Sequence, residues 1–143
     1  MDRDAMIRLL VEQLGRHRPR FLTVKQTVQI IRRIIKHARP HDTGCILWDG
    51  SVNKGHYPRM NVRLHGNHCS MYVHRLVDQL AHNPRDIPWY QEVAHSCDCP
   101  PCFHPDHVAR ERRPDNRRRS AERTNLKKRG MLPRAAADQR AAA

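Results

Sequence analysis

The chain has 143 residues, enough for about one domain, and only 38% of them are hydrophobic and 5% aromatic. That composition argues against a large core that is stable without a metal or disulfides. The net charge of +13 favours a nucleic acid as partner, because Lys and Arg displace counterions from phosphates. Since no apolar run approaches the ~20 residues of a membrane span and the first residues are charged, we expect no membrane contact and a cytoplasmic location.

Residues 1–41 are expected to be helical. A first amphipathic helix is predicted over residues 4–14, and a second should begin at Thr23, because Thr23 can cap it while Gln26 reaches back, as in a capping box. The apolar residues of the second helix are expected to form one buried stripe of Val24, Val28, Ile31 and Ile35, widened by Ile30 and Ile34. Residues 16–41 contain eight Lys or Arg and no acid, so the helices either pack on the main domain with a solvated basic face or lie on DNA.

Residues 42–125 are expected to form the compact part. Apolar and polar side chains alternate over residues 57–64, which indicates a strand with Arg59 and Arg63 on one face. Strands are predicted at residues 45–49, 57–64 and 69–74, with a turn at 65–67 between the last two. A helix is predicted at residues 75–82. Trp48 and Trp89 are expected in the core rather than as platforms for base stacking.

The C-terminal part is predicted to be a helix followed by a tail. The helix should begin near Pro114, because proline suits a first helical turn. Over residues 108–143 there are twelve Lys or Arg and four acids, so this end of the chain is basic. Residues 126–143 end in low-complexity sequence and are expected to be a flexible tail.

Three residues spaced five apart, Cys97, Cys102 and His107, lie in a proline-rich loop and predict a zinc site. In a reducing compartment such residues are expected to bind metal rather than form disulfides. The best fourth ligand is Cys45, which would join the first strand to the loop. Cys99 is the rival, although Cys97 and Cys99 would point opposite ways in an extended segment, and His104 is a weaker rival. Four protein ligands leave no open position for water, so the zinc is expected to be structural.

Several segments around this loop resemble the zinc-containing His-Me finger nucleases. This is the HNH superfamily, especially its phage HNH proteins and the His-Cys box homing endonucleases. In that branch a histidine stands two residues before the first loop cysteine, as His95 does before Cys97, and an asparagine follows the last loop histidine by nine residues, as Asn116 follows His107. The matching segments are residues 45–50, 73–75, 93–97, 105–108 and 115–116, with Cys102. The resemblance covers roughly residues 45–125.

The resemblance implies an α+β fold with a ββα-metal unit, in which a hairpin carries the histidine and a following helix carries the asparagine. It also implies that His95 is the general base that activates water and that Asn116 binds one catalytic magnesium ion. An arginine is expected to hold the phosphate, and Arg59 is the first candidate with Arg63 as the alternative. His74 is expected to support the site.

The protein is therefore expected to be a metal-dependent endonuclease from a phage or mobile element, acting on double-stranded DNA in the bacterial host. Arg117, Arg118 and Arg119 are expected to position phosphates or to be solvated. The alternatives are a non-catalytic zinc module that binds nucleic acid, or a phage packaging or assembly factor that contacts other phage proteins. A double-strand cut would suggest a homodimer.

Overall fold

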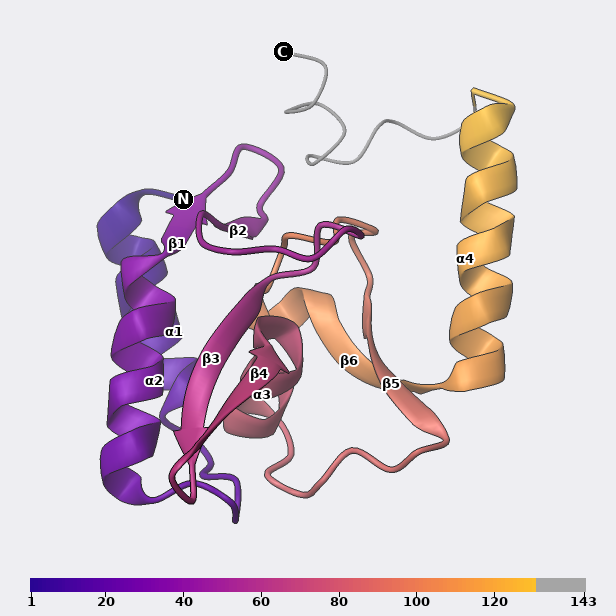
Figure 1. Ribbon diagram of the computed structural model, residues 1–143. Coiled ribbons are helices and arrows are strands. Elements are labelled where there is room, and N and C mark those ends of the chain that lie inside the picture. The colour runs from indigo at the N-terminus through magenta and orange to yellow at the C-terminus, as the bar shows by residue number, and fades with distance from the viewer. Residues whose placement is uncertain (131–143) are drawn as a thin grey trace.

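Two N-terminal helices run side by side in opposite directions (Figure 1). In this computed structural model, which describes residues 1–130, α1 (Arg3–Leu14) follows Asp2, whose carboxylate accepts a 2.7 Å hydrogen bond from the amide of Ala5. α2 (Val24–Lys36) begins with the predicted capping box, because the amides of Gln26 and Thr23 each donate to the other residue's side chain. Both predicted helices are confirmed.

The buried face of α2 differs from the predicted stripe. Thr27, Ile30 and Ile34 are the buried residues, which matches the i, i+3, i+7 spacing of one helical face. Val24 and Val28 were expected to be buried and are instead 67% and 42% exposed. The expected stripe is wrong at these two positions because they face away from the side that packs on the core.

A small antiparallel pair, β1 (Ala38–Pro40) and β2 (Ile46–Trp48), follows the helices. β2 lies within the predicted strand, whereas β1 was not predicted. A segment far along the chain lies on the other side of β2: the amide of Trp48 donates to the carbonyl of Pro101, and the amide of Phe103 donates to that of Ile46. This pairing places Cys102 beside β2, close to Cys45.

The next two strands, β3 (Arg59–Leu64) and β4 (Asn67–Tyr72), form the predicted hairpin. Its turn has only two residues, His65 and Gly66, and both have a positive φ, of 50° and 80°. Positive φ at both central residues is what a two-residue hairpin turn requires, so Asn67 already pairs in the return strand. The prediction of a three-residue turn and a return strand at 69–74 is therefore wrong by two residues.

Helix α3 (Val73–Ala81) follows β4 without a break, two residues before its predicted start. Its first amide, that of Val73, donates to the carbonyl of Pro58 at 3.0 Å, which ends the strand pairing there. His74 consequently lies in the first turn of the helix and not in a strand. Almost all residues of α3 are buried, so this helix is the centre of the core.

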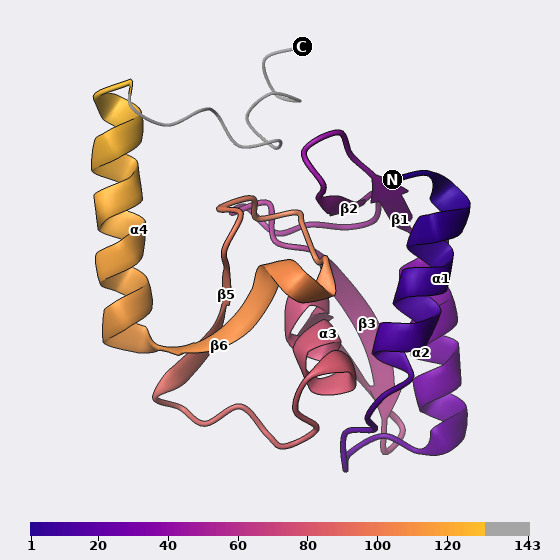
Figure 2. The same ribbon diagram turned by 180° about the vertical axis from the view of Figure 1, so that it is seen from behind.

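A second hairpin and a long helix complete the described chain. β5 (Gln91–His95) pairs with β6 (Val108–Arg112), and the loop between them ends in the short 3-10 helix η1 (Pro105–His107). α4 (Arg113–Lys128) begins directly after β6, as predicted from Pro114. It stands on the side of the molecule opposite α1 and α2 (Figures 1 and 2), and none of its residues is buried.

The predicted tail at 126–143 overlaps α4, which continues to Lys128, and residues 131–143 lie outside the described part of the chain.

The described residues share one main core, to which both N-terminal helices contribute. Trp48 belongs to this core, as expected, but Trp89 is 83% exposed, so the core assignment for Trp89 is wrong. Within residues 1–130, no helix combines the length and apolar composition that a membrane crossing needs.

Candidate metal centre and the adjoining pocket

The loop that closes the β5–β6 hairpin brings the four predicted zinc ligands together. The ligand atoms of Cys45, Cys97, Cys102 and His107 all lie within 4.8 Å of one another. Sγ of Cys102 and Nδ1 of His107 are 3.5 Å apart. Cys45 precedes β2, so an ion held here would join the loop to that strand.

The geometry and chemistry of this donor set fit a metal ion such as zinc. A tetrahedral zinc ion lies about 2.3 Å from a thiolate sulfur, which places sulfur ligands about 3.8 Å from one another. The upper limit of 4.8 Å on the observed separations is about 1 Å above that value, and three sulfurs with one imidazole nitrogen form a common structural zinc set. The four residues therefore form a cluster that could hold a structural metal.

The rival ligands lie outside this cluster. Cys99 is buried beside it, and its sulfur is not among the four converging atoms in the described chain. His104 stacks on His107 with ring centroids 4.6 Å apart, and its Nδ1 accepts a hydrogen bond from the amide of Asp106. No disulfide joins any of the five cysteines, all of which lie within residues 1–130.

Hydrogen bonds between the neighbouring thiols shift their pKa values. A hydrogen bond from Cys102 lowers the pKa of Cys45 to about 4 and also lowers the pKa of Cys97. The same contacts raise the pKa of Cys102, which acts as the donor. Two of the three sulfurs therefore favour the thiolate form that binds metal.

His95, the last residue of β5, is held by the loop that carries the candidate metal ligands. Its Nε2 donates a hydrogen bond of 2.8 Å to the backbone carbonyl of Cys102. A carbonyl can only accept, so the proton is on Nε2 and Nδ1 is left as an acceptor. The carbonyl of His95 in turn accepts a 3.2 Å bond from Arg119 of α4. Burial lowers the pKa of His95, which favours the neutral ring.

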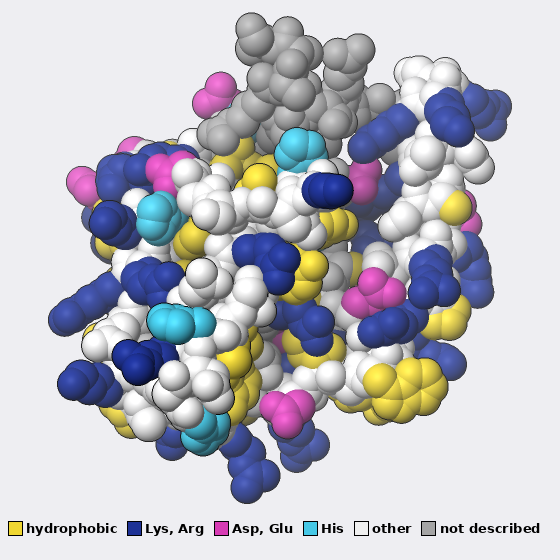
Figure 3. Space-filling model, in the orientation of Figure 1, with side chains coloured by type: hydrophobic (Ala, Val, Ile, Leu, Met, Phe, Trp, Pro, Cys, Tyr) yellow, Lys and Arg dark blue, Asp and Glu magenta, His cyan; other side chains and the backbone are white. Residues whose placement is uncertain are grey.

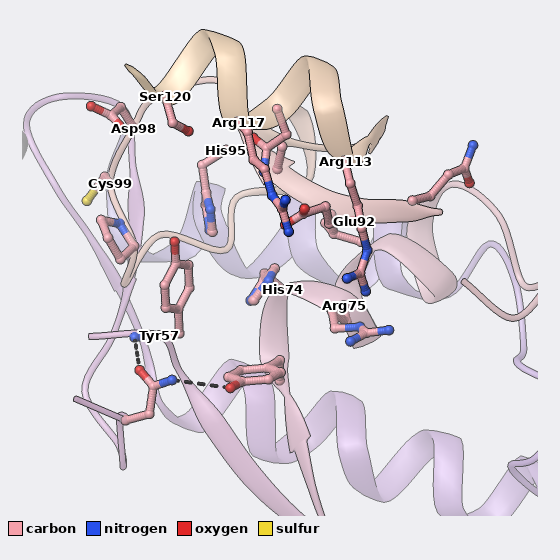
Figure 4. A pocket seen from close by; sticks show the side chains of 17 residues that line it. Tyr57, His74, Arg75, Glu92, His95, Asp98, Cys99, Arg113, Arg117 and Ser120 are labelled. Carbon is pink, nitrogen blue, oxygen red and sulfur yellow. Dashed lines mark hydrogen bonds between the residues drawn. The ribbon is translucent and has the colours of Figure 1, made fainter. Parts of the chain in front are cut away.

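A pocket of about 440 Å³ opens beside His95 (Figure 4). The rings of Tyr57, His74 and His95 lie on one side of it, and the guanidinium groups of Arg75 and Arg113 lie on the other. The lining also includes one further arginine, three amides and two carboxylates: Arg117, Asn53, Gln91, Asn116, Glu92 and Asp98. The pocket therefore combines a neutral acceptor nitrogen with three cationic side chains.

The three rings pack on one another. The ring centroids of His74 and His95 are 4.9 Å apart, and Tyr57 lies 5.4 Å and 5.8 Å from these two rings. Burial lowers the pKa of His74 to about 3, so this ring is neutral at physiological pH. Its Nδ1 is buried and has no hydrogen-bond partner within the described chain.

Neither arginine predicted to hold the phosphate lines the pocket in the described chain. Arg59 lies with its guanidinium carbon 5.3 Å from the ring centroid of Tyr72, which does line the pocket. Arg63 lies further along β3, beside α2. Both share one face of β3, as predicted, and Tyr72, which pairs with Arg59 across the hairpin, lines the pocket.

The three consecutive arginines of α4 have different surroundings. Arg117 lines the pocket, and Arg118 is 70% exposed and lies 3.9 Å from Asp115. Arg119 is bound on three sides: it donates to Glu111 at 2.8 Å, to the side-chain oxygen of Asn116 at 3.4 Å and to the carbonyl of His95. Arg119 therefore fastens α4 to the hairpin.

Neither the metal centre nor the pocket can be assigned through a relative. No protein-family model, curated protein or solved structure matches this chain. Every argument about function therefore rests on the residues of this chain and their geometry.

Most residues that line the pocket were not predicted from the sequence as site residues, among them Tyr57, Arg75, Arg113 and Glu92. Arg75 directly follows His74, and Arg113 directly precedes the proline that marks the start of α4, so both stood next to recognised signals. Glu92 and its neighbour Val93 on β5 both line the pocket, so the alternation of polar and apolar residues along this strand could not have singled out Glu92.

Proposed function

We propose that this protein is a metal-dependent endonuclease of the HNH, or His-Me finger, type that hydrolyses phosphodiester bonds in DNA. The observation that carries this proposal is the hydrogen bond from Nε2 of His95 to the carbonyl of Cys102. It fixes the ring orientation and tautomer, and it leaves Nδ1 unprotonated beside a pocket lined by arginines.

His95 acts as the general base in this proposal. A water molecule in the pocket gives a proton to Nδ1 while its oxygen forms a bond to phosphorus. The bond from phosphorus to the leaving sugar oxygen breaks in the same displacement, and that oxygen takes a proton from solvent. A neutral imidazole near pH 7 suits this step, because a protonated ring could not accept the proton.

The arginines of the pocket bind the scissile phosphate. Arg75, Arg113 and Arg117 come from α3 and α4 and line the same cavity as His95. A guanidinium group matches two phosphate oxygens and keeps its charge at any physiological pH. These three residues therefore take the role that the sequence suggested for Arg59.

Asn116 is the proposed protein ligand of a magnesium ion. Its amide oxygen is a hard ligand of the kind that magnesium prefers, it lines the pocket, and the one hydrogen bond it receives is long, at 3.4 Å from Arg119. Magnesium bound there would neutralise charge at the phosphate and the leaving oxygen. The amide oxygen of Asn116 would be the ligand that this chain supplies to the ion.

The order of elements also supports a ββα-metal unit. β5 ends in His95, β6 follows, and Asn116 lies in the first turn of α4. The loop between the two strands carries three of the four proposed zinc ligands, so the zinc holds the loop whose carbonyl orients His95. This zinc has no open position and takes no part in the chemistry.

Cleavage of supercoiled plasmid tests the proposal. With magnesium, the wild-type protein should convert supercoiled DNA to nicked or linear forms, and without added magnesium it should not. The Asn116→Ala variant should lose most of this activity. The matched control is Asn125→Ala, because Asn125 lies on the same helix but does not line the pocket.

The alternative of a non-catalytic zinc module makes the opposite prediction. Tight plasmid binding that magnesium does not affect, with no strand breaks at any enzyme concentration, would overturn the proposal. Equal loss of activity in both asparagine variants would overturn the assignment of Asn116.

A further inference from the structure

Two adjacent aromatic side chains project from the loop before β5. Trp89 is 83% exposed and Tyr90 is 49% exposed. Their ring centroids are 5.8 Å apart with the planes at 89°, an edge-to-face pair. We call them the aromatic tip. A tryptophan that exposes most of its surface to water forgoes the stabilisation that burial would give it, and large exposed aromatic groups are typical of binding surfaces.

The aromatic tip is held in place by its backbone. The amide of Gln91 donates to the carbonyl of Pro88 at 3.0 Å, which closes a turn around Trp89 and Tyr90. The carbonyl of Tyr90 accepts a 3.1 Å bond from the amide of Arg113, at the start of α4. Both rings are therefore displayed on a fixed turn, which lowers the entropy that a partner would have to remove on binding.

The part of this loop that follows α3 is held by one largely buried arginine, Arg110. Arg110 donates to the carbonyls of Asn83, Arg85 and Asp86, at distances between 2.6 and 3.2 Å. Its Nε also donates to the carboxylate of Asp78 in α3. The loop is thus attached to the core at its start and to the hairpin at its end.

The aromatic tip lies at the rim of the pocket. Gln91 and Arg113, which are bonded to the turn, both line the pocket. Two exposed arginines adjoin the tip: Arg113 donates its amide to the carbonyl of Tyr90, and Arg112 pairs with Gln91 across the hairpin. Lys and Arg side chains also cover much of the face shown in Figure 3, including α4. The tip therefore presents aromatic rings within a cationic surface.

We propose that Trp89 stacks on a DNA base beside the phosphate that is cut, with Tyr90 supporting its ring. This inference rests on the proposed function, because the pocket gives the DNA its position. Every base offers a flat face, so stacking on an exposed ring needs no particular sequence, and arginines beside the ring bind the backbone. Stacking requires a base that is unpaired or displaced from the duplex. The tip should therefore favour DNA with a gap or mismatch over a perfect duplex.

Binding without magnesium tests this inference, since it separates contact from cutting. The probes are a perfect duplex, the same duplex with a short single-stranded gap, and vesicles of anionic phospholipid. The wild type should bind the gapped duplex more tightly than the perfect one. Trp89→Ala should weaken binding to the gapped duplex about tenfold, and Trp89→Phe should keep most of the affinity because a flat ring remains. Val24→Ala, at an exposed apolar residue of α2, should bind like the wild type.

Tryptophan fluorescence gives an independent readout. Trp48 is buried, so quenching on addition of the gapped duplex should come from Trp89 and should disappear in Trp89→Phe. Unchanged affinity in Trp89→Ala, or quenching that persists in Trp89→Phe, would overturn the inference. So would binding of wild type, but not Trp89→Ala, to vesicles rather than to DNA. Plasmid cleavage with magnesium is measured in parallel. If the wild type cuts DNA but Trp89→Ala binds the gapped duplex as tightly as the wild type does, the stacking alone is refuted. If Trp89→Ala binds more weakly but the wild type does not cut DNA, the nuclease activity alone is refuted.

Discussion

Cys102 serves two roles through two different atoms. Its sulfur belongs to the candidate metal-binding cluster, and its backbone carbonyl accepts the hydrogen bond from Nε2 of His95. The position of the catalytic candidate therefore depends on the shape of the metal-binding loop. A change at a ligand should disturb His95 even though no ligand side chain lines the pocket beside it.

At the residue scale, the first prediction concerns metal content. Cys45→Ala should lose the bound metal and much of the free energy of unfolding, because the remaining three ligands no longer close the tetrahedron and the loop separates from β2. Cys99→Ala should keep about one metal ion per chain, since its sulfur does not belong to the converging group. Metal analysis of the purified variants measures both. Retention of metal by Cys45→Ala together with its loss from Cys99→Ala would reverse the assignment.

The sequence predicted these ligands better than it predicted the pocket. Cys97, Cys102 and His107 lie in one loop, so their spacing alone suggested a shared ion. The pocket arginines come from α3 and α4, which are far apart in the chain, and only the packed fold brings Arg75 and Arg113 to one cavity. The role of Arg59 stays a prediction, because its strand pattern defines a face and not what that face meets, and Arg59 lies against Tyr72 of the pocket lining.

At the scale of elements, α4 is attached by polar contacts rather than by buried apolar residues. Near its start, Arg119 binds Glu111 of β6 and the carbonyl of His95. Near its end, Lys127 forms an ion pair of 2.6 Å with Asp98 in the metal-binding loop. These contacts place the helix that carries Asn116 along the pocket.

The second prediction tests the attachment near the start of α4. Arg119→Ala should lower the midpoint of thermal unfolding and reduce cleavage, because α4 loses its bonds to β5 and β6. The cost in folding free energy should be about 1 kcal/mol, since the ion pair with Glu111 is partly exposed to solvent. Arg118→Ala is the control, because that side chain is 70% exposed and should change stability little. Equal effects of the two substitutions would contradict this role for Arg119.

Element boundaries show where sequence patterns lose precision. The capping box of α2 was predicted correctly because its signal lies within four consecutive residues. The β3–β4 hairpin was displaced by two residues, because the choice between a two-residue and a three-residue turn depends on backbone angles at His65 and Gly66. β1 was missed because its three residues, which include Pro40, form a strand only through pairing with β2.

At the scale of the whole molecule, one buried ion pair connects the core to the second hairpin. The side chains of Asp78 in α3 and Arg110 in β6 are 2% and 11% exposed, and their atoms lie 2.6 Å apart. Arg110 also binds three carbonyls of the loop that leads to the aromatic tip. It therefore joins α3, the loop and β6.

The third prediction follows from this connection. Arg110→Ala should lower the free energy of unfolding by roughly 3–5 kcal/mol, because it leaves the carboxylate of Asp78 buried without its partner. Urea denaturation measures this value. Arg112→Ala, on the same strand but exposed, should have little effect. A loss below about 1 kcal/mol for Arg110→Ala would show that water replaces the arginine without difficulty.

The central claim is that a metal-held loop orients His95 to cut DNA, and one paired measurement on His95→Ala tests it most directly. Plasmid cleavage with magnesium and zinc content are determined on the same preparation, with His17→Ala as the control. We expect His95→Ala to keep about one zinc ion per chain and to cut about 100- to 10,000-fold more slowly than the wild type, the usual range for loss of a general base. Cleavage at the wild-type rate by a zinc-loaded His95→Ala protein would contradict the account.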